Sequence, residues 1–480
     1  MKSNSVSSNF IWRFFERALA QGVTFAVALI LARLLDPQVY GVIAIVTVII
    51  SILQVFVDGG LGNSLIQKLD ADDIDFSTVF FFNVFICLVL YGVLFVFAPL
   101  LSYFYNIPEL TSIIRVLGFT IIISGVKNIQ QAYVAKRMIF KKFFYATLSG
   151  TVISAFVGVF MAYKGFGVWA LVFQSLTNLF IDTVVLWFVV DWRPKLCFSF
   201  VRLKTLLSFG WKLLLSRLLT AISTNIRQLI IGKKYTTDDL AFYNRGIEFP
   251  TKIVPLISTS VDDVLFPTLS LKQKEHDDLM LMFRKSIKVI SFIIFPILVG
   301  MIVCGESVIK LLLTDKWLPA YPYLCIFCCE YAISPISTIY NNAFKAIGRS
   351  DITLKIQIVI RTFGIASVFV ALNIGVVAIA FSSLITSFIE YISVMVFGKI
   401  YLKYRLRDQI RDIIPSVIVS LIMGVVVFVI GTIDINYVPL LFIQVTIGVI
   451  VYLLISYMFK LESFSFLVKK IKSISIKKKA

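Results

Sequence analysis

The sequence predicts an all-α polytopic membrane protein with about fourteen transmembrane helices. Of its 480 residues, 59% are hydrophobic and only 15% are charged, whereas a soluble domain is about one quarter charged. The apolar residues form long runs without the polar stripe of a buried soluble helix. The clearest runs are 42–57, 84–101, 289–303, 413–433 and 440–457. A weak internal repeat is the third observation, and it favours transport, because duplicated membrane proteins often hold a substrate path between their halves.

The expected helices follow the apolar runs and stop at turn signals such as Asp36-Pro37 and Arg193-Pro194. In the first half they cover 10–33, 40–66, 77–103, 111–135, 143–164 and 167–190. In the second half they cover 205–232, 240–266, 286–313, 319–346, 353–372 and 375–400, followed by 412–432 and 437–459.

The repeat relates residues 165–176 to residues 373–384, which lie 208 positions later. Asp182 and Glu390 follow at corresponding positions of the two copies. Six helices per copy is an even number, so both halves enter the bilayer from the same side and form a parallel repeat. The expected organisation is an N-lobe (1–200), a C-lobe (201–405), two further helices (406–460) and a basic cytoplasmic tail (461–480).

The net charge of +19 comes mostly from alternate loops. The positive-inside rule therefore places both termini in the cytoplasm. One loop on that side is acidic, with Asp70, Asp72, Asp73 and Asp75. Topology and attraction to anionic membrane lipids account for the basic surplus, so no nucleic-acid partner is expected.

Several charged residues fall deep within the expected helices, where a charge costs roughly 2.5 kcal/mol or more and normally faces protein or water. For each of them, a structural ion pair and a contact with ligand are both open readings; Arg245 and Glu248, three residues apart, can pair within one helix. The basic residues outnumber the acids, which predicts a positively charged cavity suited to phosphate. The basic set is Arg13, Arg17, Lys127, Arg227, Arg245, Lys252 and Arg361, and the acids that could couple transport to an ion are Glu330, Asp182, Glu390 and Glu248.

The stretch 244–255 combines these charges with Gly246, Pro250 and Pro255. Each proline removes a backbone donor and disfavours a straight helix. Broken helices at membrane depth often line transport sites, so we expect a hinge or a site-lining segment here. A kink needed only for packing is the alternative.

Catalytic and metal-binding signatures are missing from the sequence. The single histidine, His276, lies in a polar loop, and no GxSxG, HExxH or P-loop motif occurs. Cys325, Cys328 and Cys329 lack the histidine or second cysteine cluster of a zinc site. We therefore expect a transporter without metal or cofactor, not an enzyme.

Two stretches carry a resemblance to a known family. One is ILARLLDPQVYG (30–41) with VDGGLG (57–62), and the other is LAFYNRG (240–246) with Pro250 and LFPTLS (265–270). With the fourteen-helix layout, the sequence resembles Wzx-type polysaccharide flippases of the multidrug/oligosaccharidyl-lipid/polysaccharide exporter superfamily. The resemblance implies a V-shaped pair of lobes that alternates access around a central cationic cavity.

The implied cargo is an undecaprenyl-diphosphate-linked oligosaccharide that crosses the bacterial inner membrane for O-antigen, capsule or exopolysaccharide synthesis. Related lipid II flippases use arginines on the first and eighth helices, which points first to Arg13, Arg17 and Arg245. The resemblance also implies H⁺ or Na⁺ as coupling ion, and a polysaccharide polymerase with its chain-length machinery as partners.

Other functions remain open at this stage. A multidrug exporter of the same superfamily would be expected to have an acidic cavity, since its usual substrates are cations. A lipid II flippase would share the lobes and the basic cavity. A membrane enzyme of envelope polysaccharide assembly belongs to a different class, and a structural scaffold would leave the deep charges unexplained.

Overall fold

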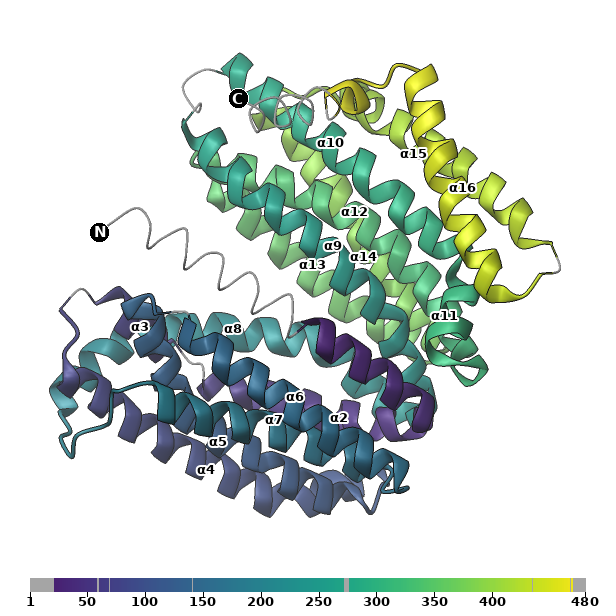
Figure 1. Ribbon diagram of the computed structural model, residues 1–480. Coiled ribbons are helices and arrows are strands. Elements are labelled where there is room, and N and C mark those ends of the chain that lie inside the picture. Colours follow the sequence, from purple (N-terminus) through teal and green to yellow (C-terminus); the bar gives the residue numbers. More distant parts are fainter. Residues whose placement is uncertain are drawn as a thin grey trace, which may run out of the picture. The chain divides into compact units, whose positions relative to one another are not determined.

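The protein is described by a computed structural model that covers residues 21–57, 60–68, 70–139, 141–271, 276–433, 435–466 and 468 (Figure 1). These residues form helices and no strands. Contacts divide the chain into two compact units, residues 1–241 and 242–480. The lobe boundary expected after residue 200 rests on the sequence repeat and stays a prediction.

Unit 1 is a bundle of helices whose bounds follow the expected apolar runs closely. Its first described helix is Gln21–Leu34. The others are α2 (Pro37–Val57), α3 (Leu61–Gln67), α4 (Asp73–Tyr105), α5 (Leu110–Arg137), α6 (Lys141–Tyr163), α7 (Val168–Val189) and α8 (Phe200–Lys234).

Unit 2 begins within the first turns of α9 (Thr237–Leu271). The helices that follow are α10 (His276–Val303), α11 (Gly305–Leu313), the 3₁₀ helix η1 (Asp315–Ala320), α12 (Tyr321–Ala346), α13 (Ser350–Ala371), α14 (Val376–Tyr401), α15 (Leu406–Gly431) and α16 (Tyr437–Met458).

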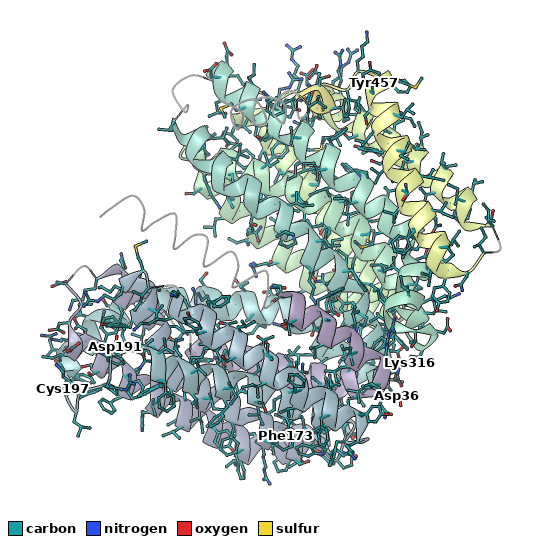
Figure 2. All side chains as sticks on the ribbon, in the orientation of Figure 1. Asp36, Phe173, Asp191, Cys197, Lys316 and Tyr457 are labelled. Atoms are coloured by element: carbon teal, nitrogen blue, oxygen red, sulfur yellow. The ribbon has the colours of Figure 1, made fainter. Side chains whose placement is uncertain are left out.

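Eleven of the described helices are long and apolar enough to cross a membrane. In α4 only 17% of the apolar window is buried by protein, so most of that helix is available to lipid. In unit 1, Figure 2 shows Asp191 and Cys197 at one end of the bundle, Asp36 at the other end, and Phe173 between them. The chain is therefore a multi-pass α-helical membrane protein, as predicted, while the expected total of fourteen spans stays a prediction.

Two of the expected helices are broken. The expected helix 40–66 is divided into α2 and α3, and Gly60 before α3 has a φ of +88°. A Cβ at Gly60 would lie 2.7 Å from the carbonyl oxygen of Gly210, so glycine fits both the left-handed backbone and the close approach of α8. The expected helix 286–313 is divided at Cys304, whose φ of −88° and ψ of 0° end α10.

The sequence repeat has a structural counterpart at the start of α7 and α14. Gly167 and Gly375 lie 208 positions apart, and each is the N-cap residue of its helix. Their φ values are +55° and +149°, which side chains rarely tolerate. The matched glycines therefore mark the same turn in both copies.

Prolines inside α4 and α10 leave backbone carbonyls without the usual helical donor, and other side chains supply one. Pro99 cannot donate to the Phe95 carbonyl, which instead accepts from Arg115 Nε of α5 at 3.3 Å. Pro296 likewise leaves the Phe292 carbonyl, which accepts from the Tyr452 hydroxyl of α16 at 2.7 Å. In a bilayer, such cross-helix bonds satisfy groups that water cannot reach.

The last two helices are attached to α10 by polar contacts as well as by packing. Figure 1 shows α15 and α16 beside α10, and their shared core includes Phe292, Met423 and Tyr452. Near the start of α15, the buried Asp412 carboxylate accepts from Arg284 Nε of α10 at 2.7 Å and from Arg284 Nη2 at 3.0 Å. This bidentate pair fixes the register between the two helices.

Candidate functional site

A charged cluster lies on one face of α9, at the place where the sequence predicts ligand contacts. Arg245 and Lys252 both contact the Glu248 carboxylate, one at each oxygen. The spacings of three and four residues bring these side chains together on a helix. Two cations share this one carboxylate, and the Lys252 side chain is 45% exposed.

Arg245 is held in place from a second direction. Its guanidinium lies 4.9 Å from the ring centre of Trp317, a fully buried residue of η1. Stacking on an aromatic ring stabilises and orients a guanidinium. Arg245 is itself buried, so this residue has a structural role whatever else it contacts.

The segment predicted to be a hinge is a continuous part of α9, and it packs closely on α12. A Cβ on Gly246 would lie 2.4 Å from the Tyr323 Cβ and 2.8 Å from the Leu324 nitrogen. Gly246 is therefore required for close helix packing. Pro250 is buried and Pro255 is exposed, and the hinge role of this segment stays a prediction.

In unit 1, Lys127 of α5 forms an ion pair with Asp182 of α7. Their side chains are 12% and 11% exposed, so the pair is largely enclosed. A Cβ on Gly150 of α6 would lie 3.1 Å from the Asp182 Cβ, which shows how tightly α6 covers this acid. For Lys127 and Asp182 the structure thus displays the ion pair, one of the two readings that the sequence left open.

The corresponding acid of the second copy has different surroundings. Glu390 of α14 accepts a long hydrogen bond from Gln357 Nε2 of α13 at 3.5 Å. Among the described residues no basic side chain forms an ion pair with Glu390, in contrast to Asp182. Glu330 of α12 accepts a hydrogen bond from Ser383 of α14, so both acids lie among the helices of one bundle.

Two further basic residues, Arg227 and Arg361, are partly buried within the protein. Arg227 of α8 is half-buried, and its Nε atom is buried without a hydrogen-bond partner in the part of the chain that the structure describes. Arg361 of α13 is also half-buried. Arg13 and Arg17 lie outside the described residues.

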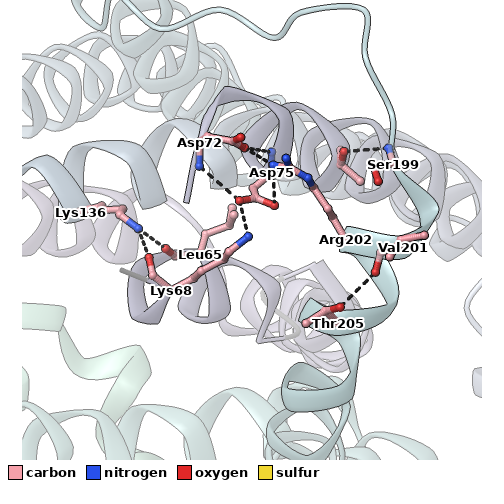
Figure 3. Close-up of polar contacts among 10 residues, drawn as sticks. Leu65, Lys68, Asp72, Asp75, Lys136, Ser199, Val201, Arg202 and Thr205 are labelled. Atoms are coloured by element: carbon pink, nitrogen blue, oxygen red, sulfur yellow. Dashed lines mark hydrogen bonds and ion pairs between the residues drawn. The ribbon is translucent and has the colours of Figure 1, made fainter. Parts of the chain in front are cut away.

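A network of ion pairs occupies one end of unit 1, and the sequence did not reveal it (Figure 3). Asp72 accepts from the Asp75 backbone N–H at 3.0 Å and caps α4, and its carboxylate also pairs with Arg202 of α8. The hydrogen bond from Arg202, followed by that from the Asp75 backbone, lowers the pKa of Asp72 to about 2. The spacing Asp72-x-x-Asp75 is a capping signal that could have been recognised.

The same network joins α3, α4 and α5. Lys68 Nζ lies 2.6 Å from the fully buried Asp75 carboxylate, and Lys136 of α5 donates to the Leu65 carbonyl at 2.9 Å. Lys136 therefore satisfies a carbonyl near the end of α3, where helical donors run out. The loop that the sequence presents as simply acidic is thus an anchoring point for three helices and the start of α8.

The family of the chain follows from comparison with known proteins. Residues 30–322 match the family described as "Polysaccharide biosynthesis protein", which is more than half of the chain. The chain belongs to this family. The resemblance to polysaccharide transporters in the sequence is thereby confirmed.

Relatives of this family member have names that concern surface polysaccharides. It is 22% identical over 352 residues to "Succinoglycan biosynthesis transport protein ExoT" of Rhizobium meliloti, covering 73% of this chain and 71% of the relative. It is 24% identical over 363 residues to "Lipopolysaccharide biosynthesis protein WzxC" of Escherichia coli, covering 73% and 72%. For "Teichuronic acid biosynthesis protein TuaB" of Bacillus subtilis, identity is 26% over 306 residues, covering 62% of each chain.

Solved structures establish the fold of this family member. A lipid II flippase MurJ in an inward closed conformation matches with a TM-score of 0.76 at 16% identity, over 94% of this chain and 98% of that one. An inward-facing multidrug resistance MATE transporter of the MOP superfamily matches with a TM-score of 0.61 at 13% identity, over 79% and 94%. The chain therefore shares its fold with both of these proteins.

Proposed function

We propose that this protein is a flippase for undecaprenyl-diphosphate-linked oligosaccharides in the bacterial inner membrane. Family membership and the names of the relatives support a polysaccharide transporter, and the α9 cluster is the observation that supports this cargo. A diphosphate carries several negative charges and accepts hydrogen bonds from lysine and arginine. The product would serve O-antigen, capsule or exopolysaccharide synthesis, with a polymerase and chain-length machinery as downstream partners.

We rank the basic residues for this role by their exposure and their contacts. Lys252 is the strongest candidate, because its side chain is exposed on the face of α9 that carries the cluster. Arg227 follows, since its buried Nε atom has no hydrogen-bond partner among the described residues. Lys127 ranks lower because Asp182 neutralises it, and Arg361, Arg13 and Arg17 remain candidates from the sequence alone.

The test is translocation of a labelled undecaprenyl-diphosphate oligosaccharide in proteoliposomes. We expect Lys252→Gln and Arg227→Gln each to slow translocation about tenfold, because a hydrogen bond to a charged group contributes about 1.5–3 kcal/mol. Lys355→Gln is the matched control, since Lys355 is 67% exposed and pairs with an exposed aspartate. Translocation at the same rate in empty liposomes would reject the flippase, and unchanged rates in both variants would reject this site.

A lipid II flippase is the second candidate, because the MurJ structure matches nearly the whole chain. Both cargoes share the diphosphate, so the α9 cluster does not distinguish them. Parallel assays with lipid II and with a lipid-linked oligosaccharide separate the two, and we expect the oligosaccharide to be the faster cargo.

Two alternatives predict different products. A multidrug exporter would move cationic dyes and would gain nothing from Lys252 and Arg227. An enzyme of envelope assembly would alter the oligosaccharide covalently, whereas a flippase returns it unchanged. Mass analysis of the recovered lipid therefore tests the enzyme alternative in the same experiment.

Ion coupling is part of the proposal. Among the four acids suggested by the sequence, Glu390 is best placed to exchange H⁺ or Na⁺, because Asp182 and Glu248 are paired with cations and Glu330 accepts from Ser383. Moving an ion through a site requires that its affinity differ between two conformations. We further propose cytoplasmic N- and C-termini, on the basis of the loop charges.

A further inference from the structure

A charged pocket of about 530 Å³ lies in unit 2 beside the first half of α10. Its other wall is the short helix of residues 462–466, which follows α16. Three basic residues of α10 line the pocket: Arg284, Lys285 and Lys288. Among the described residues, none of α9 lines this pocket, so it is separate from the cargo contacts proposed for Lys252 and Arg245.

The pocket lies where two membrane-spanning segments end. The three cations directly precede the uncharged run 289–303 of α10, and the short helix begins just after the apolar α16. Basic side chains at the ends of apolar helices reach the level of lipid headgroups. Pockets of this kind between helices bind anionic lipid headgroups.

The cations are held in position from behind. The Asp412 side chain is 2% exposed, and its carboxylate pairs with Arg284 at 2.7 Å and with Lys288 at 3.2 Å. One buried carboxylate therefore fixes two cations. Asp277 and Glu462 also line the pocket, so its wall holds acids as well as cations. Lys285 adds another charge, and its ammonium lies 3.5 Å from the ring centre of Phe466 without a carboxylate partner in the described chain.

Apolar side chains complete the pocket. Leu281, on the same helix as the cations, is 65% exposed. Phe466 of the short helix also lines the pocket. Cations and exposed apolar surface together suit a ligand with an anionic group and a hydrocarbon chain. A free phosphate would leave the apolar part of the pocket unused.

We propose that this pocket binds an anionic phospholipid. Its phosphate lies on Lys285 and Lys288, and an acyl chain packs against Leu281 and Phe466. The inference goes beyond the proposed function, because it concerns a resident membrane lipid and holds whatever cargo is transported.

Glu462 gives the proposal a sharp test. Its side chain is 79% exposed and pairs with Lys288, so it competes with a lipid phosphate for that ammonium. Removing the Glu462 charge should strengthen lipid binding, whereas removing the Lys285 charge should weaken it. Non-specific attraction of anionic lipid to a basic surface would respond equally to the loss of an exposed lysine elsewhere, so a control lysine outside the pocket is needed as well.

The experiment is native mass spectrometry of the full-length protein released from membranes of phosphatidylglycerol and phosphatidylcholine. We expect preferential retention of phosphatidylglycerol, about fivefold less in Lys285→Gln and more in Glu462→Gln, since a lysine near the membrane surface contributes about 1 kcal/mol. Both side chains are exposed at the pocket, so neither change empties a core position. Lys399→Gln, an exposed lysine in the last turn of α14, is the matched control and should retain lipid normally.

A second arm separates lipid from free phosphate. Millimolar inorganic phosphate should not displace phosphatidylglycerol, because the acyl chain contributes to binding. Displacement by phosphate would overturn the lipid assignment in favour of a small-anion site. Equal retention of phosphatidylglycerol by the wild type, Lys285→Gln and Glu462→Gln would overturn the site itself.

Discussion

The ion pairs of this protein form both within one helix and between helices that are far apart in the sequence. Arg245 and Lys252 find Glu248 within one helical turn, whereas Lys127 reaches an acid 55 residues away on another helix. Helical spacing accounts for both contacts with Glu248, and the sequence offered the Arg245–Glu248 pair as one of two open readings. The pairing of Lys127 depends on how α5 and α7 pack, so no local pattern announces it.

The Asp72–Arg202 pair predicts a pH-dependent contribution to stability. The pKa of Asp72 is lowered from 3.8 to about 2, so the stabilisation is complete above pH 3.8 and is lost as pH falls through about 2. Because both side chains are partly exposed, we expect Asp72→Asn to cost less than about 1 kcal/mol at pH 7. Asparagine caps helices as well as aspartate does, so the change isolates the charge.

Thermal unfolding in detergent measures this effect at pH 7 and again near pH 2.5. The difference between wild type and Asp72→Asn should shrink at the lower pH. Asp70→Asn, the same charge change at an exposed position of this loop, is the control. A difference that persists unchanged at low pH would contradict an electrostatic origin.

At the scale of the element, prolines in α4 and α10 define where other helices must attach. Each proline frees a carbonyl four residues earlier, and a side chain from a neighbouring helix donates to it. The freed carbonyl can be read from the sequence, since it lies at a fixed distance from the proline. The identity of its donor cannot, because Tyr452 is 160 residues from Phe292.

The Tyr452 contact predicts a non-additive pair of substitutions. Tyr452→Phe should destabilise the protein by about 1–2 kcal/mol, because the Phe292 carbonyl is left without a donor in an apolar environment. Pro296→Ala restores a backbone N–H for this carbonyl. In that background Tyr452→Phe should cost much less.

A double-mutant cycle in denaturant unfolding measures the coupling between Tyr452 and Pro296. Tyr457→Phe is a matched control, because Tyr457 is 72% exposed on the same helix. Equal costs of Tyr452→Phe in the two backgrounds would show that the hydroxyl does not compensate for the proline.

The sequence predicts where the membrane-spanning helices lie better than it predicts where they are broken. The apolar runs located most spans to within a few residues, because the hydrocarbon core imposes their length and composition. The exception is α10, which begins at His276, in the stretch expected to be a polar loop and well before the expected start at 286. The break at Gly60 has a local signal that the expected helix 40–66 ignored, because the run Asp-Gly-Gly at 58–60 is typical of a turn. The break at Cys304 follows an apolar run and has no comparable signal before it. Gly60 is required by the approach of Gly210, a contact between distant residues.

For the whole molecule, the two copies of the repeat share a framework and differ in charge. Gly167 and Gly375 start equivalent helices, and Asp182 and Glu390 follow at equivalent positions. The first acid is neutralised by Lys127, while the second has Gln357 as its polar neighbour. Of the two equivalent acids, Asp182 is therefore paired with a cation, whereas Glu390 has no basic ion-pair partner among the described residues.

This asymmetry predicts that Glu390 couples transport to an ion gradient. In proteoliposomes, Glu390→Gln should translocate cargo at the rate that the wild type shows without a gradient. Asp182→Asn should instead lower stability, since it leaves the Lys127 ammonium enclosed without its carboxylate.

Imposed pH and Na⁺ gradients, applied separately, identify the ion. Retention of gradient-driven acceleration by Glu390→Gln would remove this residue from the coupling mechanism without affecting the flippase proposal. Glu330→Gln serves as the comparison, because Glu330 lies in the same bundle and accepts from Ser383.

The bond between Tyr452 and the Phe292 carbonyl also bears on biosynthesis. A ribosome that has completed α10 has not yet made the tyrosine that this helix needs, since α16 is the last of the described spans. When α10 is first made, the Phe292 carbonyl therefore lacks the hydroxyl that donates to it in the folded protein. A chain that stops before α16 lacks Tyr452, so its Phe292 carbonyl keeps neither a backbone donor nor this hydroxyl.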